Sequence, residues 1–265
     1  MTVLLEIRNV QRRFESVSVL SDINVKVAEG EFVSIVGPSG CGKSTLMNII
    51  AGLMRPDSGQ VLLADKDITG SSGHVGYMFQ KDLLIPWRTV LGNITLGPSL
   101  KGRVSRADVL DAAKMAERYG LGQFIDNYPH TLSGGMRQRV ALMRTLLLHR
   151  PVMLLDEPFG ALDAQTRVQL QQWLLAVWTD TGGTIFFITH DIDEAIFVSD
   201  RVLVMSARPG TIASEIPIDL KRPRGLDVTT SEEFVLLKRR AMELLYTSHG
   251  LGMASGAPGS AGGVQ

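Results

Sequence analysis

Residues 31–45 read EFVSIVGPSGCGKST, an apolar run followed by a glycine-rich segment that ends in Lys43 and Ser44. Residues 37–44 match the pattern GxxxxGK[ST], in which glycines let backbone N–H groups turn toward phosphate oxygens. The lysine can reach the outer phosphates of a nucleotide, and the serine hydroxyl is a ligand for Mg²⁺. The stretch therefore predicts a phosphate-binding loop between a buried strand and the N-terminus of a helix.

On both sides of this loop, short apolar runs alternate with helical patterns. Unbroken apolar runs are typical of parallel strands that are buried on both faces, so we expect an α/β fold with a mainly parallel sheet and flanking helices. The stretch at 86–150 interrupts the alternation and is interpreted as an α-helical lobe. The expected strands are residues 4–10, 23–30, 31–37, 60–68, 74–79, 152–158, 184–190 and 201–206, and the clearest helices outside the lobe are 44–53, 163–178 and 194–200.

Composition limits the possible partners of the chain. The 27 basic and 27 acidic residues among 265 cancel, so no overall charge favours nucleic acid or an anionic membrane. The single cysteine, Cys41, excludes an internal disulfide and is typical of a reducing compartment. No signal peptide is recognised, and no apolar stretch approaches the roughly 18–20 residues that span a bilayer. We therefore expect a soluble chain that reaches a membrane only through another chain.

Polar side chains follow the predicted strands at one edge of the sheet. Asp156 and Glu157 end the run VMLLDE, where Asp156 can hold Mg²⁺ and Glu157 can act as a general base on water. His190 ends TIFFITH and Gln80 ends HVGYMF, so both are expected at the same edge. The alternatives are a turn that begins at Asp-Glu-Pro and a histidine with a structural role only.

The order of these motifs identifies a family resemblance. GPSGCGKST, Gln80, LSGGMRQR (132–139), VMLLDEP, the turn from Ala161 to Asp163, and His190 follow one another in a fixed sequence. Together they resemble the nucleotide-binding subunit of ABC transporters over about residues 3–220. The resemblance implies a P-loop NTPase with a RecA-like parallel sheet, an N-terminal antiparallel β part and an inserted helical lobe.

The resemblance also implies a role for each matched position, with ATP and Mg²⁺ as ligands. Glu157, His190 and Gln80 would be catalytic, and Ser44, Gln80 and Asp156 would hold the metal. Phe14 would stack on adenine, although an aromatic residue there could equally belong to the core. The implied nucleotide-binding residues are Phe14, Gly37, Pro38, Ser39, Gly40, Cys41, Gly42, Lys43, Ser44 and Thr45.

A second glycine-rich turn opens the helical pattern at LSGGMRQR. In the resembling family, this signature does not serve the nucleotide of its own chain. Two chains meet head to tail, and Ser133, Gly134 and Gly135 of one cover the γ-phosphate that Lys43 of the other holds. Asp163 would lie at the same interface, and the expected partner is a second copy of the chain.

Apolar residues are crowded after Gln80, in KDLLIPWRTVLGNI. We interpret Leu83, Leu84, Pro86 and Trp87 as a docking surface for a membrane permease; the alternative is a small core under the helical lobe. The predicted organisation is one nucleotide-binding domain at 3–225, with its core at 3–85 and 151–225 and its helical lobe at 86–150. A helical extension at 226–248 and a disordered tail at 249–265 would follow.

Three further segments resemble those of bacterial-type importer subunits for nitrate, sulfonate, taurine or bicarbonate. They are PWRTV, DEPFGALDAQTR and RPGTIASEIPIDLKRPR. The predicted function is ATP hydrolysis that drives such a permease from the cytoplasmic face of the plasma membrane, with a solute-binding protein as an indirect partner. The alternatives are import of a vitamin precursor or other small organic solute, and a non-transport ABC ATPase. DNA-repair ABC proteins would need a long coiled coil, and translation factors two cassettes, neither of which is found.

Overall fold

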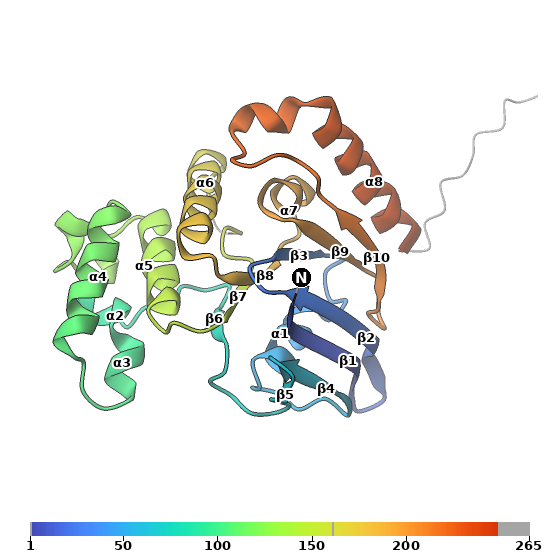
Figure 1. Ribbon diagram of the computed structural model, residues 1–265, viewed down its shortest axis with the longest axis horizontal. Coiled ribbons are helices and arrows are strands. Elements are labelled where there is room, and N and C mark those ends of the chain that lie inside the picture. Colours follow the sequence, from blue (N-terminus) through green and yellow to red (C-terminus); the bar gives the residue numbers. More distant parts are fainter. Residues whose placement is uncertain (1, 161, 249–265) are drawn as a thin grey trace, which may run out of the picture.

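A computed structural model describes residues 2–160 and 162–248, which form two sheets and the helices packed on them (Figure 1). Among these residues, no helix is both long enough and apolar enough to cross a lipid bilayer. The tail at 249–265, for which the sequence predicts disorder, lies outside the described residues.

The smaller sheet is antiparallel and comes entirely from the N-terminal part of the chain. In its second strand Ile23, Val25 and Val27 are buried, whereas Asn24 and Lys26 between them are exposed. This alternation gives the sheet one face toward the core and one toward solvent. Within the described residues its strands run in the order β2 (Val17–Ala28), β1 (Val3–Phe14), β4 (Ser58–Leu63) and β5 (Lys66–Asp67).

The larger sheet is parallel except at one edge, where β10 (Ile212–Pro217) runs antiparallel to β9 (Arg201–Met205). Its central strand β3 (Phe32–Val36) is buried on both faces, as an apolar run without alternation requires. The predicted α/β fold with a mainly parallel sheet is therefore confirmed. Within the described part of the chain the order is β10 (Ile212–Pro217), β9 (Arg201–Met205), β3, β8 (Thr184–Ile188), β7 (Val152–Asp156) and β6 (Gly76–Met78).

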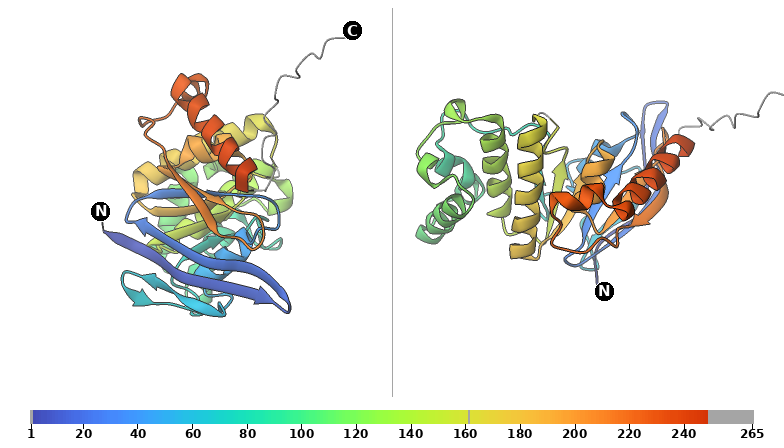
Figure 2. Two further views of the ribbon diagram at one scale, coloured as in Figure 1. Left: turned by 90° about the vertical axis from the view of Figure 1, so that its right-hand side faces the viewer. Right: turned by 90° about the horizontal axis from the view of Figure 1, so that it is seen from above.

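Two hydrophobic clusters hold the layers together. Val33 and Ile35 of β3 join a cluster with the helix α1 (Lys43–Ile50) and the smaller sheet. Phe32 and Val36 join a second cluster with helices on the opposite face (Figure 2). Those helices include α6 (Ala164–Thr181), α7 (Ile192–Val198) and α8 (Glu232–Ser248). As a result α1, which the phosphate loop precedes, is fixed between the two sheets.

The segment between β6 and β7 is helical and has its own hydrophobic cluster. The cluster includes Ile94, Ala116 and Met143, and Trp173 of α6 packs against both this cluster and the second one. Figure 2 shows these helices at one end of the molecule. The boundaries of the lobe at 86 and 150 stay a prediction. Its helices are α2 (Val90–Ile94), α3 (Leu96–Leu100), α4 (Arg106–Arg118) and α5 (Gly134–Leu146).

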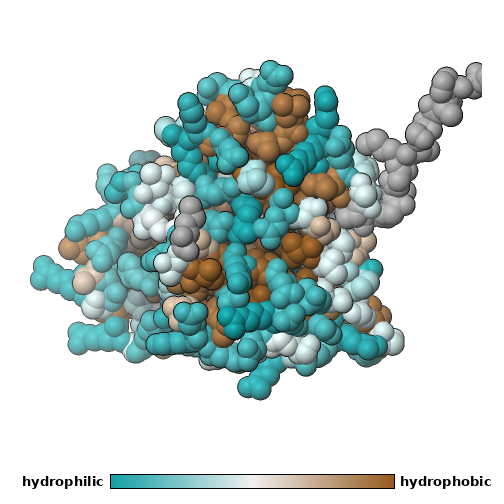
Figure 3. All heavy atoms as spheres, turned by 45° about the vertical axis from the view of Figure 1, so that its right-hand side comes forward, coloured by the Kyte–Doolittle hydropathy of each residue, from teal (hydrophilic) through white to brown (hydrophobic). Residues whose placement is uncertain are grey.

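The last helix, α8, lies across β9 and β10 and buries Phe234 and Ala241. Val235, Met242 and Tyr246 remain exposed between charged side chains, and apolar atoms are visible among polar ones at the top of Figure 3. The helix is therefore amphipathic, but its outer face is not uniformly polar.

Two segments differ from the sequence-based expectation. Residues 60–68, expected to form one strand, instead form the hairpin of β4 and β5. Its turn places Ala64 and Asp65 at φ +47° and +61°, a conformation that glycine usually adopts, so the sequence carried no turn signal. The edge strand β10 was not expected, because Ala213 and Ser214 break the alternation of apolar and polar residue types in its sequence, although burial alternates along the folded strand.

Candidate functional site

The phosphate loop connects the end of β3 to the first turn of α1. Gly42 caps α1 at φ +112°, and a Cβ there would come within 2.7 Å of the Leu20 side chain. No side chain caps the helix, so its first N–H groups can bind an anion. The buried Lys43 donates from Nζ to the carbonyl oxygens of Gly37, at 2.8 Å, and Pro38, at 2.9 Å. The ammonium is thus held over the loop, where phosphate oxygens can replace these carbonyls.

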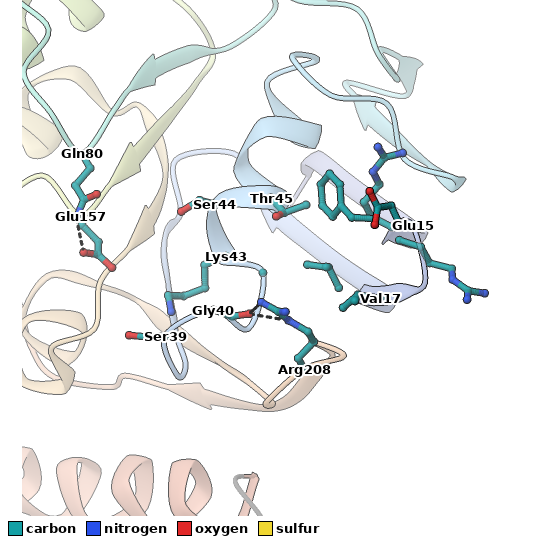
Figure 4. Close-up of a pocket in the computed structure, with 15 residues that line it drawn as sticks. Glu15, Val17, Ser39, Gly40, Lys43, Ser44, Thr45, Gln80, Glu157 and Arg208 are labelled. Atoms are coloured by element: carbon teal, nitrogen blue, oxygen red, sulfur yellow. Dashed lines mark hydrogen bonds between the residues drawn. The ribbon is translucent and has the colours of Figure 1, made fainter.

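A cavity of about 840 Å³ opens between the phosphate loop and the N-terminal sheet (Figure 4). Phe14 lies at its edge with 41% of its surface exposed, and the Arg12 guanidinium is 4.8 Å from the centre of the ring. Phe14 is therefore not a core residue and is free to stack on a base. The cavity is lined by Arg12, Arg13, Phe14, Glu15, Val17, Val19, Ser39, Gly40, Gly42, Lys43, Ser44, Thr45, Gln80, Glu157 and Arg208.

Three of the predicted nucleotide-binding residues, Gly37, Pro38 and Cys41, form the back of the loop and do not line this cavity. Cys41 is only 1% exposed and packs in the first hydrophobic cluster, where burial raises the pKa of its thiol. A Cβ at Gly37 would lie 2.9 Å from the Met205 carbonyl oxygen. The Cys41 side chain faces the core, so only its backbone can serve a phosphate, and the role of Cys41 in nucleotide binding stays a prediction.

Asp156, the last residue of β7, brings a buried carboxylate to the loop. Burial raises the pKa of Asp156 above its ordinary value, and the hydrogen bond from the Ser44 hydroxyl opposes that shift. The Tyr77 hydroxyl also donates to Asp156, at 3.3 Å. A buried carboxylate beside a hydroxyl is a donor set that suits Mg²⁺, which prefers oxygen ligands and would neutralise the buried charge. Ser44 and Asp156 would hold the ion beside the outer phosphates and so lower the charge repulsion that a nucleophile meets there.

Glu157 gathers two predicted catalytic side chains around its carboxylate. Gln80 donates from Nε2 to Glu157 Oε2 at 3.1 Å, and His190 Nδ1 lies 3.3 Å from the same oxygen. Glu157 has φ +44°, which is rare for a residue with a side chain, and its N–H is held by the Ile188 carbonyl at 2.9 Å. Strain of this kind is tolerated where the carboxylate must occupy a defined position. The carboxylate can accept a proton from a water molecule at the cavity.

The signature LSGGMRQR (132–139) lies outside the cavity of the phosphate loop. Ser133 caps α5 and accepts a hydrogen bond from the Met136 N–H at 3.3 Å. Neither Ser133 nor its two glycines line the cavity of the phosphate loop in the same chain. Gly134 instead borders a second hollow, of about 550 Å³, together with Gln80, Glu157 and His190. Gly134 therefore faces the predicted catalytic side chains of its own chain across this hollow.

Asp163 begins α6, where its exposed side chain accepts the Thr166 N–H at 3.0 Å. This hydrogen bond lowers the pKa of Asp163. Arg167, which the sequence did not single out, bonds the Leu162 carbonyl at 3.2 Å and the Asp191 carboxylate at 3.4 Å. It ties the turn that carries Asp163 to the segment after His190.

The predicted docking residues do not form one group. Trp87 and Leu83 are 76% and 52% exposed, and Pro86 is also exposed. Leu84 is half-buried and packs against the second and third hydrophobic clusters, so it is assigned to the core. The core interpretation therefore applies to Leu84, whereas docking through Leu83, Pro86 and Trp87 stays a prediction.

Two arginines of α5 fix the segment after Gln80 in place, which the sequence did not reveal. Arg137 pairs with the Asp82 carboxylate at 3.0 Å, and Arg144 donates to the carbonyls of Asp82 and Leu83 at 2.6 and 2.8 Å. Burial lowers the pKa of Arg144. Side chains such as these belong to no local pattern, since their partners lie more than 50 residues away.

The fold and the site together define a P-loop NTPase. The ABC transporter profile matches residues 20–160. An ABC transporter ATP-binding protein of Methanocaldococcus jannaschii is 47% identical over 92% of both chains, and a taurine import ATP-binding protein of Yersinia pestis is 41% identical over 82% of this chain and 85% of its own.

Among solved structures, an ATP-binding cassette in a dimeric post-hydrolysis state with ADP and Pi superimposes with a TM-score of 0.71. It is 31% identical and covers 82% of this chain and 100% of its own. The chain belongs to the ABC transporter family. It is the ATP-binding subunit of such a transporter and hydrolyses ATP.

Proposed function

We propose that two copies of the chain close on ATP in a head-to-tail dimer. Lys43 and the phosphate loop of one copy hold the phosphates, and the exposed Ser133 and half-buried Gly134 of the other cover them. This proposal is supported by the absence of the signature from its own phosphate cavity and by a related cassette that was solved as a dimer. Asp163, exposed at the start of α6, would lie at the same interface.

Within each site, Glu157 takes the proton of the attacking water, and the new bond to the γ-phosphorus displaces ADP. Gln80 and His190 orient the Glu157 carboxylate and the water through their hydrogen-bonding groups. Ser44, Asp156 and the amide oxygen of Gln80 would hold Mg²⁺. The observation that carries the proposal is the meeting of these side chains at one oxygen, 3.1 Å from Gln80 and 3.3 Å from His190.

We propose that the transport function is import of a small solute such as nitrate, a sulfonate, taurine or bicarbonate. The description as a small anion covers these solutes only in part, because taurine is a zwitterion. A 41% identical relative is named for taurine import, and the sequence style resembles subunits for nitrate, sulfonate, taurine and bicarbonate. The exposed Leu83, Pro86 and Trp87 would dock on a permease, which would place the chain at the cytoplasmic face of the membrane as a peripheral subunit. Import of a vitamin precursor or another small organic solute is the second candidate.

The test is reconstitution of the chain with its permease and solute-binding protein in lipid nanodiscs, followed by ATPase assays with single solutes. Stimulation by taurine, a sulfonate, nitrate or bicarbonate is expected. Stimulation by a pyrimidine vitamin precursor would support the second candidate, and no response to any solute would contradict import. Trp87→Asp should prevent copurification with the permease. Tyr246→Asp, on the exposed face of α8, is the matched control.

A further inference from the structure

The loop between β9 and β10 brings to the nucleotide cavity a cation to which the sequence assigned no role, although it opens the quoted segment RPGTIASEIPIDLKRPR. Arg208 lines the cavity and donates from Nε and Nη2 to the carbonyl oxygen of Gly40, at 3.1 and 2.7 Å (Figure 4). Gly40 belongs to the phosphate loop. The guanidinium therefore grips the backbone of the loop with two donors.

These two hydrogen bonds fix the orientation of the peptide group between Gly40 and Cys41. A trans peptide is planar, so its C=O and N–H point in opposite directions. With the Gly40 carbonyl turned toward Arg208, the Cys41 N–H points to the interior of the loop, where it meets the Pro38 carbonyl at 3.3 Å. That bond is long, so a phosphate oxygen can replace the carbonyl at little cost. Arg208 thus fixes the direction in which one anion-binding N–H is presented.

The contact with Arg208 restricts a part of the phosphate loop that is otherwise flexible. Gly40 has φ +75° and no side chain, so by itself it could turn the peptide in more than one direction. An N–H that must be reoriented when phosphate binds would reduce the affinity for phosphate. A second contact at the Gly40 carbonyl removes that freedom before the nucleotide arrives.

The loop that carries Arg208 is itself held firmly. Gly210 donates to the Val19 carbonyl at 2.9 Å and accepts from the Ser21 N–H at 3.0 Å, which joins the loop to β2. A Cβ at Gly210 would lie only 2.2 Å from the Cys41 carbonyl oxygen, so the loop touches the back of the phosphate loop directly. The base of Arg208 therefore does not move freely relative to Gly40.

We propose that Arg208 is a positioning residue for phosphate binding: it orients the Gly40–Cys41 peptide so that the phosphate loop is formed before ATP enters. It acts on the affinity for the polyphosphate and not on the step that breaks the phosphate bond. The inference rests on the proposed role of the phosphate loop, and its test separates the two.

The experiment measures ATP and ADP binding to the full chain by calorimetry, together with kcat and KM for ATP. Arg208→Ala should weaken the binding of both nucleotides about three- to tenfold, the size of one typical net hydrogen-bond contribution, and leave kcat within twofold of wild type. Arg208→Lys keeps the charge but loses the fork, so it should recover only part of the affinity. Arg106→Ala, an exposed arginine of α4, is the control and should bind as wild type does.

Wild-type affinity in Arg208→Ala, a fall in kcat without a change in affinity, or full recovery by lysine would each overturn the inference. If Arg208→Ala does not fold, the lysine variant decides by the same criteria. Lys43→Ala is measured in parallel. If it also binds ATP normally, the proposed role of the phosphate loop fails; if only the Arg208 variants bind normally, the present inference alone fails.

Discussion

The N-termini of α1 and α5 both follow glycine-rich turns, yet they offer different chemistry. At α1 the cap residue is Gly42, which provides no side chain, so the first amides and Lys43 are left for an anion. At α5 the cap residue is Ser133, whose hydroxyl already accepts the Met136 N–H. One turn is therefore built to surround a phosphate, and the other is partly satisfied and presents a single exposed face.

The glycines of α5 differ from one another as well. A Cβ at Gly135 would lie 2.6 Å from Thr166 Cγ2, because α5 and α6 approach closely there. A Cβ at Gly134 would make only ordinary contacts, with Leu162 Cδ2 at 3.4 Å and Arg137 Nη2 at 3.9 Å. Packing within the chain thus explains Gly135 but not Gly134, and the bare surface at Gly134 suits an approaching ligand held by another chain.

The largest expected effect belongs to the site at α1. Glu157→Gln should bind ATP but lose turnover by about a hundredfold or more, because the carboxylate that accepts the proton of water is gone. Dimers should accumulate with ATP, since the ATP that holds the two chains together is no longer hydrolysed. ATPase assays and size-exclusion chromatography with ATP measure both effects. Turnover near that of wild type would exclude Glu157 as the base.

The next effect separates the two glycines at α5. Gly134→Ala should keep the thermal midpoint of unfolding but lower ATPase about tenfold or more, because a methyl group would displace the cover from the γ-phosphate. Gly135→Ala should instead lower the stability by about 1–3 kcal/mol through overpacking against Thr166. Thermal unfolding and ATPase assays of the pair distinguish these outcomes. If Gly134→Ala were destabilised, or fully active, Gly134 would have no separate role in ATP hydrolysis.

The smallest effect concerns the buried carboxylate at α1. Because burial raises the pKa of Asp156, its ionisation opposes folding, and that penalty grows as the pH rises above its ordinary pKa of 3.8. Without nucleotide, Asp156→Asn should therefore be as stable as wild type at low pH. At neutral pH it should melt about 2–4 °C higher if the penalty is about 1 kcal/mol.

Addition of ATP with Mg²⁺ should stabilise wild type but not this variant, since the metal ligand is lost. Thermal unfolding between pH 4 and 8 is the measurement, and Tyr77→Phe, which removes a donor to Asp156 but no metal ligand, is the control. A variant that is less stable than wild type at neutral pH would contradict the account of the buried charge.

The sequence predicted those elements whose pattern is local. β3, β7 and β8 are unbroken apolar runs, and the phosphate loop follows a fixed spacing, so both could be recognised from consecutive residues. The same holds for the positions of Gln80 and Glu157 at strand ends, which the parallel sheet then brings within 3.1 Å.

The remainder depended on contacts between distant segments. Arg208 reaches Gly40 across 168 positions, and Arg144 reaches Leu83 across 61, so no local pattern could indicate them. The turn at Ala64 was missed because it has positive φ without glycine, and the inward packing of Leu84 because exposed and buried apolar residues look alike in a sequence.

The central claim is that the signature serves the nucleotide of a second chain and not the hollow it borders in its own. The most direct measurement mixes two inactive variants, Lys43→Ala and Ser133→Arg, after crosslinking has verified that mixed dimers form. In a mixed dimer, one site combines the intact Lys43 of one chain with the intact Ser133 of the other. Each mixed dimer is expected to regain up to about half of the wild-type ATPase activity. Mixed dimers that form but hydrolyse no more ATP than the two separate variants would contradict it.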